Sequence, residues 1–536
     1  MEKSINIEES KNKEVGINFL SILAPKTAFD YKELGLALNE EPDKIIKGLG
    51  FKEIRLPSFS VSNLTMVADV FYDFIKSVAD DEKLYNKFIN EQPKTIYYAT
   101  ESNDDPSRPE LSAAFSILYS KLLDEDEKKY RVFIEILKKA EIKQVTFACA
   151  GGGLALTDAV SRVALADKLG RSESAIVITS DTAVYDPKRA PKAETTQGAA
   201  TTLSWITTEP ELESIDYEIG FSSFNLPFPD FTKFGARTPK VYGTFSERGY
   251  VYGAAKVMEQ IEEKYKQQGK NIKSFNVLLA HVPFPKQAIY FSRFLFEHYV
   301  KNNEKEVFEA IQRREDIGPD PLSYNKFTAL IDKKFREFEG NKEQEIVKHI
   351  SEDIDINNYW KWLGKVGAQD RESGKFKLNE FGKFIESFHI MDALELPSIV
   401  GNSYTSSLFV SNASLIQNLI KEKDATNKEG VAIFYGSGKV IVGVPFKINV
   451  KNERNLHINI DKDTIYLKAS QYDLIHDNLM KGDAARTIVD YNLLEIDEKL
   501  FGRLTDGFHL LRRYDDGTSD AVYVKDGKII DIKPRY

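Results

Sequence analysis

The chain holds a single cysteine, Cys149, within the segment VTFACAGGGLALTDAV at residues 145–160. Three glycines follow it, and the pattern predicts a strand, a sharp turn and a helix. The free N–H groups at a helix N-terminus favour a thiolate and can hold an oxyanion, so this position suits a nucleophile. A buried, inert cysteine would explain the same segment, because cysteine packs well as a small apolar side chain. The segment alone leaves both interpretations open.

Three more side chains with useful chemistry stand at the ends of predicted strands. Glu101 ends the strand of TIYYATES, His281 ends that of NVLLAHVPFPK, and Asn402 follows LPSIVG. Ligands of layered α/β proteins bind beyond the carboxyl ends of the strands, so these side chains could converge with Cys149. A single strand-end glutamate or asparagine is more often a cap or a solvated residue. Their joint occurrence favours nucleophilic catalysis by a cysteine with a nearby base.

Other kinds of site fit the sequence poorly. The glycines are not followed by the Lys-Ser/Thr pair of a phosphate-binding loop, and they do not match a dinucleotide-binding G-x-G-x-x-G. The seven histidines lack zinc-ligand spacing, and only one cysteine is present. We therefore expect no metal and no cofactor.

The elements that must position these residues alternate between short apolar runs and longer amphipathic ones, which predicts a layered α/β fold. Residues 154–169 have helical periodicity and end before Gly170, a residue type preferred just after a helix. The expected strands are Ile96–Thr100, Gln144–Ala148, Ala175–Thr179, Val277–Ala280 and Val431–Tyr435.

Two later segments have a different pattern. Residues 300–390 are charged and helical, and we interpret them as an insertion that packs on the core as a solvated appendage, in preference to a lid over a site. One helix face there is apolar and ends at Gly340; it comprises Phe327, Leu330, Ile331, Phe335 and Phe338. The polar tail after residue 451 is predicted to be rich in strands, with hairpin turns at Asp516-Gly517 and Asp526-Gly527.

The composition of the 536 residues limits the classes of function. A net charge of -9 argues against nucleic acid as the main partner. One cysteine excludes an internal disulfide and fits a reducing compartment. The N-terminus shows no cleavable apolar core, and no apolar run is long enough to cross a bilayer. We expect a cytoplasmic protein without a membrane partner.

Seven short strings occur in a fixed order along the chain: ATES, FACAGG, SDTAVY, TQGA, AHVPFPK, GNSYT and YGSG. Together they resemble 3-hydroxy-3-methylglutaryl-CoA (HMG-CoA) synthase of the thiolase superfamily. The resemblance extends over residues 17–300 and 395–450 in outline, and the helical insertion and much of the tail remain unmatched.

The resemblance implies a thiolase fold, in which two similar βαβαβ halves form αβαβα layers, and a homodimer or a dimer of dimers. Residues 1–14 would be a flexible N-terminus and residues 15–215 the first half, which carries the cysteine. Residues 216–450 would be the second half, which carries the histidine, the asparagine and the insertion. Residues 451–536 would be a C-terminal extension.

The implied reaction condenses acetyl-CoA with acetoacetyl-CoA and water to give HMG-CoA and CoA, a step towards mevalonate and isoprenoids. By matching position, Cys149 resembles the nucleophile that accepts the acetyl group, and Glu101 the general base. His281 resembles the histidine that binds and polarises the acetoacetyl group. Glu101 can remove a proton from the acetyl methyl group only if burial raises its pKa towards the working pH. The CoA thioesters are substrates, and an acetoacetyl-CoA thiolase is a candidate partner.

Further residues match the family by position. Its acyl and oxyanion pocket is lined at the positions of Asn402, Tyr404, Gly436 and Ser437. Asp181 matches an acidic residue that supports catalysis from outside the pocket, and Lys286 a lysine near the CoA entrance. Tyr242, in PKVYG, stands where the family's P-x-V-D-G segment has an acidic residue. Tyrosine can donate a hydrogen bond but is uncharged at neutral pH, so the support for catalysis is expected to be altered.

Three alternatives compete with this reaction. A related synthase adds the same two-carbon branch to a β-keto acyl group on a carrier protein, but the net negative charge disfavours docking of an acidic carrier. A ketoacyl synthase of the fatty-acid type would use cysteine, histidine and asparagine and leave Glu101 without a function. A non-catalytic scaffold is favoured only by Tyr242 and the insertion.

Overall fold

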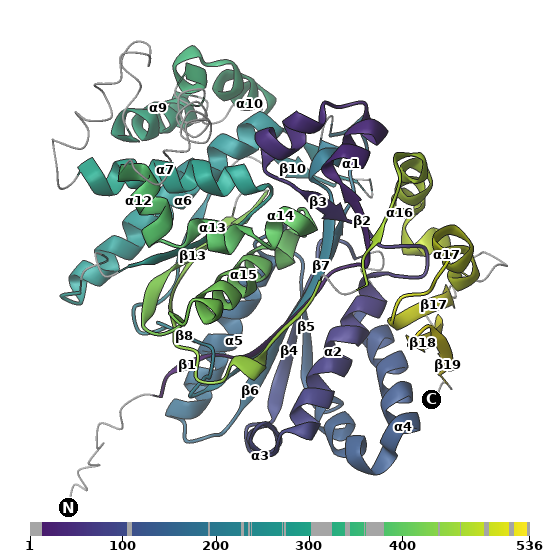
Figure 1. Cartoon of the computed structure of the whole chain (residues 1–536). Helices are drawn as coiled ribbons and strands as arrows, with labels where there is room; N and C mark the ends of the chain where they lie inside the picture. The colour runs from purple at the N-terminus through teal and green to yellow at the C-terminus, as the bar shows by residue number, and fades with distance from the viewer. Residues whose placement is uncertain are drawn as a thin grey trace, which may run out of the picture.

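A large mixed sheet with helices on both sides forms the centre of the molecule (Figure 1). The computed structural model describes residues 13–103, 110–190, 193–226, 230–233, 236, 238–270, 272, 275–301, 324–337, 343–358, 360, 380–437, 440–460, 463–486, 493–513 and 519–532. Within these residues no helix is both long and apolar enough to cross a membrane.

The first half of the sheet has the strand order β5-β4-β6-β7-β1. Its members are β1 (Val15–Leu23), β4 (Pro93–Ala99), β5 (Glu141–Val145), β6 (Ser174–Ala183) and β7 (Gly198–Thr208). β4 is parallel to β5 and β6, whereas β7 is antiparallel to β6 and β1. β7 is buried at every position, because helices or strands cover both of its faces, and its sequence is therefore apolar or small throughout.

The second half repeats this succession in the order β12-β13-β14-β8. Its members are β8 (Glu213–Ile215), β9 (Ser222–Asn225), β12 (Val277–Ala280), β13 (Lys428–Gly436) and β14 (Val440–Ile448). β12 is parallel to β13, and β14 is antiparallel to β13, β8 and β9. The halves join where β1 pairs with β8. The predicted architecture of two similar halves is confirmed.

Two helices lie between the halves and four cover them from outside. α5 (Gly151–Lys168) and α15 (Ser407–Lys421) contact strands of both halves. The outer helices are α2 (Asn63–Asp80) and α4 (Glu110–Leu137) on the first half, and α6 (Gly243–Gln267) and α7 (Pro285–Lys301) on the second. Gly170 follows α5 with a φ of +69°, as the predicted helix end requires.

The shorter elements connect these layers. They are β2 (Thr27–Asp30), β3 (Glu53–Arg55), β10 (Phe231–Thr232), β11 (Lys240–Val241), α1 (Tyr31–Leu38), α3 (Glu82–Asn90), α13 (Ile390–Leu394) and α14 (Pro397–Val400).

The helical insertion packs on the outer helices of the second half. Its described helices are α9 (Tyr324–Glu337), α10 (Glu343–Glu352) and α12 (Glu380–Ser387). Phe327 and Ile331 are buried in the same core cluster as residues of α6 and α7, with Leu330 and Phe335 packed against it. Phe338 and Gly340 lie outside the described residues. The insertion is thus an appendage on the core, as the apolar face predicts.

The segment after residue 451 is only partly strand-rich. It contains helices α16 (Tyr472–Arg486) and α17 (Leu493–Phe501) beside the strands β15 (Leu456–Asn459), β16 (Ile465–Tyr466), β17 (Gly507–Arg513), β18 (Ser519–Lys525) and β19 (Lys528–Asp531). β15 pairs in parallel with β1, and α16 buries Tyr472 and Ile475 in the core of the first half. The hairpin turn at Asp526-Gly527 is confirmed by positive φ at both residues, and the Asp516-Gly517 turn lies outside the described residues. The domain boundaries stay predictions.

Candidate active site

Cys149 lies in a tight turn between β5 and α5. β5 ends at Val145 instead of continuing to Ala148 as predicted, and Ala148 has a φ of +45°. This left-handed conformation costs a residue with a Cβ about 1–2 kcal/mol, so packing around the turn must maintain it. The N–H of Gly151 donates to the carbonyl oxygen of Ala148 over 3.0 Å, and α5 begins there.

The three glycines serve close packing and not the turn that we expected. They belong to the helix, and the positive φ is at Ala148. A Cβ on Gly152 would lie 2.7 Å from the carbonyl oxygen of Thr405, and one on Gly153 would lie 2.5 Å from the ring of Phe434. Hydrogen in place of a side chain therefore lets the start of α5 press against the second half.

A cavity of about 350 Å³ opens at Cys149 between the two halves. Four other residues predicted from the sequence also line it: His281, Asn402, Tyr404 and Ser437. Tyr185, Phe231, Glu247, Tyr250 and Tyr435 are among the remaining lining residues. The structure thus brings together the predicted nucleophile, histidine and asparagine from segments more than 100 residues apart.

Glu101 lines a neighbouring cavity of about 330 Å³, and Tyr404 is common to the two. Burial raises the pKa of Glu101 to about 7, and the nearby Asp181 carboxylate acts in the same direction. The Lys233 ammonium, 4.0 Å from Oε2 of Glu101, partly opposes these effects. The condition set for a general base, a carboxyl with a raised pKa, is therefore met.

Asp181 fixes the backbone on which Glu101 stands. Its fully buried carboxylate accepts hydrogen bonds from the backbone N–H of Glu101 (2.7 Å), Ser102 (2.9 Å) and Thr405 (3.0 Å). The hydroxyls of Thr100, Ser102 and Thr405 also donate to it. Asp181 thus joins the loop after β4 to the segment that carries Tyr404.

The protonation states of Cys149 and His281 follow from their burial. Burial raises the pKa of the Cys149 thiol well above its usual range, and the charges of Glu101, Asp181 and Asp230 add to this effect. Burial, together with these carboxylates, thus favours the neutral thiol over the thiolate that the helix N-terminus was expected to favour. Burial lowers the pKa of His281 to about 3, so its imidazole is neutral at physiological pH.

The asparagine and its neighbours form a bonded wall of the cavity. Nδ2 of Asn402 donates to the hydroxyl of Tyr185 (3.3 Å), and Oδ1 accepts from the backbone N–H of Tyr404 (3.0 Å). Tyr404 has a φ of +44°, a second strained residue at this site. A Cβ on Gly436 would lie 2.8 Å from Cβ of Ala150, so glycine is required where β13 approaches the cysteine turn.

Tyr242 and Lys286 lie at the border of the site. Tyr242 directly precedes α6, and Lys286 is in the first turn of α7. Neither residue lines the cavity of Cys149, although residues next to each of them in the sequence do. The sequence missed Asp230, whose buried carboxylate accepts a hydrogen bond of 2.7 Å from the hydroxyl of Tyr435. It also missed Lys233. No motif marks the segment that carries these two residues.

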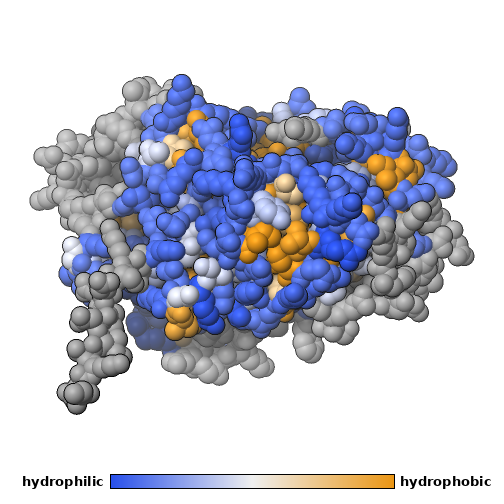
Figure 2. Space-filling model, turned by 90° about the horizontal axis from the view of Figure 1, so that it is seen from below, coloured by the Kyte–Doolittle hydropathy of each residue, from blue (hydrophilic) through white to orange (hydrophobic). Residues whose placement is uncertain are grey.

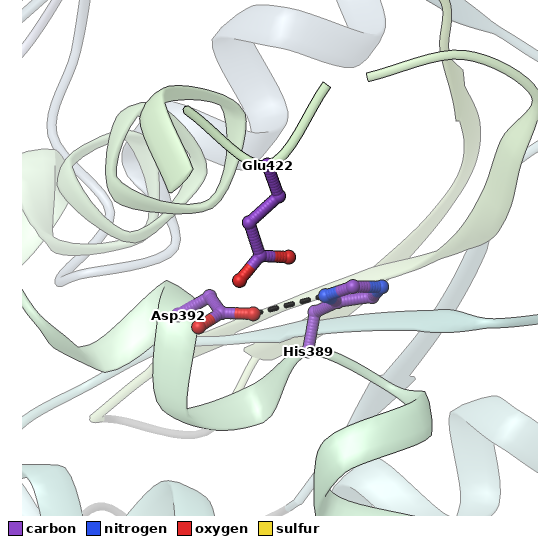
Figure 3. A group of neighbouring side chains, drawn as sticks. All are labelled: His389, Asp392 and Glu422. Carbon is purple, nitrogen blue, oxygen red and sulfur yellow. Dashed lines mark hydrogen bonds and ion pairs between the residues drawn. The ribbon is translucent and has the colours of Figure 1, made fainter. Parts of the chain in front are cut away.

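One further group of side chains was not predicted from spacing. His389, Asp392 and Glu422 have possible ligand atoms within 4.8 Å of one another, and Nδ1 of His389 lies 2.9 Å from Oδ2 of Asp392 (Figure 3). None of the three lines the cavity of Cys149 or that of Glu101. The expectation that the protein needs no cofactor stays a prediction.

The layered fold of two similar halves is thiolase-like, and a cysteine, a histidine and an asparagine surround one cavity between the halves. No family model matches the sequence. The chain is 26% identical to the hydroxymethylglutaryl-CoA synthase of Haloferax volcanii over 429 residues, which are 79% of this chain and 81% of that protein.

Solved structures agree on the fold. The structure is similar to MvaS in complex with 3-hydroxy-3-methylglutaryl coenzyme A (TM-score 0.63, 17% identity, 96% of this chain and 100% of that one). It is also similar to the HMG synthase of the curacin biosynthetic pathway in complex with holo donor-ACP (TM-score 0.62, 14% identity, the same coverage). The resemblance to HMG-CoA synthase, the thiolase fold and the prediction of an enzyme are confirmed.

Proposed function

We propose that the protein is a hydroxymethylglutaryl-CoA synthase that condenses acetyl-CoA with acetoacetyl-CoA through an acetyl group on Cys149. The observation that carries the proposal is the meeting of Cys149, His281 and Asn402 in one cavity, with a glutamate of pKa about 7 beside it. The likeness to the Haloferax volcanii enzyme over most of both chains supports this choice of substrates.

In the first step, the sulfur of Cys149 attacks the acetyl thioester, and the bond between acetyl carbon and CoA sulfur breaks. The CoA sulfur leaves with the proton that the base took from the Cys149 thiol, which returns the base to its ionised form. Because the resting thiol is protonated, a base must take its proton. Glu101, with a pKa of about 7, has the required basicity, whereas His281, with a pKa of about 3, is too weak.

In the second step, Glu101 removes a proton from the methyl group of acetyl-Cys149, and the resulting enolate attacks the ketone of acetoacetyl-CoA. The neutral imidazole of His281 can donate its N–H to the alkoxide that forms. Water then cleaves the thioester at Cys149 and releases the product as a free carboxylate. Asp181 contributes by holding the Glu101 backbone through the 2.7 Å hydrogen bond.

The decisive experiment is intact mass spectrometry after mixing the protein with acetyl-CoA alone, with Cys149→Ser as the matched control. We expect an acetyl adduct on the wild type and none on the variant. Acetoacetyl-CoA should then discharge the adduct, with HMG-CoA as the product. An absence of adduct on the wild type under all conditions would refute covalent acyl transfer and favour the scaffold.

A carrier-protein substrate is the second candidate. The likeness to the curacin-pathway HMG synthase, whose structure holds a donor-ACP, favours it, and the net charge of -9 disfavours it. The two candidates differ in the ratio of kcat/KM for acetoacetyl-CoA to that for an acetoacetyl group on an acyl carrier protein. A ratio well above one supports the reaction with acetoacetyl-CoA. A ratio well below one refutes it in favour of the reaction on a carrier protein.

The proposal includes a homodimer. β5 lies at an edge of the sheet, and next to it Phe147, Leu165 and Leu169 are 47, 56 and 61% exposed. Figure 2 shows a compact hydrophobic patch on one otherwise mostly hydrophilic face. An open edge strand beside apolar side chains is suited to pairing with a second copy. Sedimentation should give a dimer that Phe147→Asp dissociates; a monomeric wild type would contradict this.

We also propose a cytoplasmic location, which the single cysteine supports, and channelling from an acetoacetyl-CoA thiolase. Co-purification with such a thiolase and a higher rate in its presence are the expected results. If neither is found with the purified proteins, the thiolase partner is abandoned.

A further inference from the structure

A second cavity lies against the first, and the reaction described above gives it no function. Its volume is about 330 Å³, close to that of the Cys149 cavity. Tyr404 lines both cavities, and Glu101 lines only the second. The base therefore stands at the boundary, with the thioester on one side and this second space on the other.

The walls of the second cavity are polar and carry two positive charges. Its lining residues are Glu101, Ser102, Asn103, Thr182, Val184, Lys233, Ala236, Thr238, Tyr404 and Lys481. Among these described residues, two ammonium groups thus face one carboxylate, that of Glu101, beside hydroxyls and an amide. Lys481 is exposed, whereas Glu101 and Lys233 are largely buried, so a neutral apolar ligand would leave these two groups poorly solvated and an anion would be stabilised by the ammonium groups.

Lys233 lies in direct contact with the residue proposed as the base. Its Nζ donates a hydrogen bond to the backbone oxygen of Glu101 and lies 4.0 Å from Oε2 of the same residue. It also lies 5.8 Å from the ring centres of Phe231 and Tyr404. Contacts of this kind hold the ammonium at the boundary between the cavities and limit the side-chain entropy that anion binding would cost.

We propose that the second cavity is a carboxylate subsite, which receives the carboxyl group that hydrolysis creates at Cys149, with Lys233 and Lys481 as its cations. This inference rests on the proposed function. In that step water adds to the thioester carbon, the carbon–sulfur bond breaks and the sulfur takes one proton of the water. The other proton of the water is on the new carboxyl group and is released when this group ionises. A negative charge therefore forms beside Glu101.

The charges around the second cavity explain why a negative charge is stabilised there. While Glu101 is ionised, its carboxylate is the counter-charge of Lys233. When Glu101 carries a proton, the ammonium lacks that partner and attracts another anion. Carboxylate binding and protonation of Glu101 should therefore favour each other, and affinity should rise as the pH falls through about 7.

The first test measures binding without turnover. The probe is free 3-hydroxy-3-methylglutarate, observed by ligand NMR on the full unmodified chain, with the uncharged 3-methylpentane-1,3,5-triol as the matched ligand. We expect the triol not to bind, and Lys233→Met to weaken the carboxylate about 10- to 100-fold, the usual loss for a hydrogen bond to a charged group. Lys233→Arg, which keeps the charge, should restore part of the affinity.

Lys481→Gln and Lys188→Gln complete the design. Lys481 does not contact Glu101 in any described hydrogen bond or ion pair, so its substitution tests the cavity separately from the base. Lys188 is exposed and lines neither cavity, and its variant should bind like the wild type. Wild-type affinity in both Lys233→Met and Lys481→Gln overturns the subsite. If Lys233→Met does not fold, Lys481→Gln decides.

The second test separates this inference from the proposed function. Intact mass is recorded while the enzyme turns over acetyl-CoA and acetoacetyl-CoA. Lys481→Gln should accumulate the condensed adduct on Cys149 about 10-fold above the wild type, because the variant binds the carboxylate formed by hydrolysis more weakly. If the wild type turns over and the variant shows no such excess, the subsite fails alone. If the wild type never acquires an acetyl group, the proposed function fails, whatever the binding data show.

Discussion

Replacing the Asp181 carboxylate by an amide tests how the fold holds the base. Asp181→Asn keeps one carbonyl oxygen, which can still accept from the N–H of Glu101 and Ser102, but it turns the second acceptor into an NH₂ donor. The Thr405 hydroxyl has another acceptor, the carbonyl oxygen of Ala99 at 3.2 Å. The Thr405 N–H, which donates to Oδ2 over 3.0 Å, loses its acceptor. One orphaned buried N–H costs about 1–3 kcal/mol of unfolding free energy.

The same substitution removes a negative charge near Glu101. That charge raises the pKa of Glu101, so the variant should have a pKa below the value of about 7 found with Asp181. A base works when deprotonated; the acid limb of the rate should therefore rise at a lower pH in the variant than in the wild type.

Two measurements check this reasoning. Urea denaturation gives the loss of unfolding free energy, and exchange of the acetyl methyl protons on acetyl-Cys149 with deuterium, followed against pH, gives the pKa of the base. Asp186→Asn, which changes a half-buried carboxylate outside the site, is the control and should alter neither. A loss below about 0.5 kcal/mol in Asp181→Asn, together with an unshifted pH limb, would refute the role assigned to this carboxylate.

Two more predictions concern a buried carboxyl group and a close contact. Burial raises the pKa of Glu213 to about 8, so the stability it contributes is complete below its unfolded pKa near 4.5 and is lost as the pH rises through 8. Glu213→Gln, whose amide can still accept from Asn412, should flatten the fall of Tm between pH 5 and 8; an unchanged slope would contradict this. Gly153→Ala should destabilise the protein by about 1–3 kcal/mol, because its Cβ would lie 2.5 Å from the ring of Phe434. Gly243→Ala, which meets no atom within 4 Å, should change Tm little, and equal effects of the two glycine variants would argue against the close packing.

Local signals in the sequence were sufficient to predict an element where the residues at its ends mark its bounds. The strand Val277–Ala280 is predicted to the residue, because an apolar run ends there at His281 and Pro283. The motifs likewise predicted residues that meet in one cavity. What the sequence could not give depends on distant segments: Lys233 reaches Glu101 only through the tertiary fold, and carboxylates from three segments surround Cys149.

The conformation of the cysteine turn shows the same limit. Three glycines in a row suggest that they adopt the strained backbone conformation, but the positive φ is at Ala148. The glycines are needed instead because Thr405 and Phe434, far along the chain, leave no space for a Cβ on Gly152 and Gly153. α16 was missed for a related reason. Its polar and apolar residues show little helical periodicity, so that packing of Tyr472 and Ile475 in the core of the first half decides its structure.

The pairing of β1 with β15 has a consequence for biosynthesis. Strand β1 can pair with β15 only after more than 400 further residues have been translated, since Leu20 pairs with Leu456. At about 5–20 residues per second the ribosome needs on the order of 20–80 s for that length. Throughout this interval the nascent first half lacks one flank of its opening strand and the side chains that α16 inserts. A chain released early would thus expose apolar surface to chaperones and proteases, and the core around the half that carries Cys149 is complete only when translation ends.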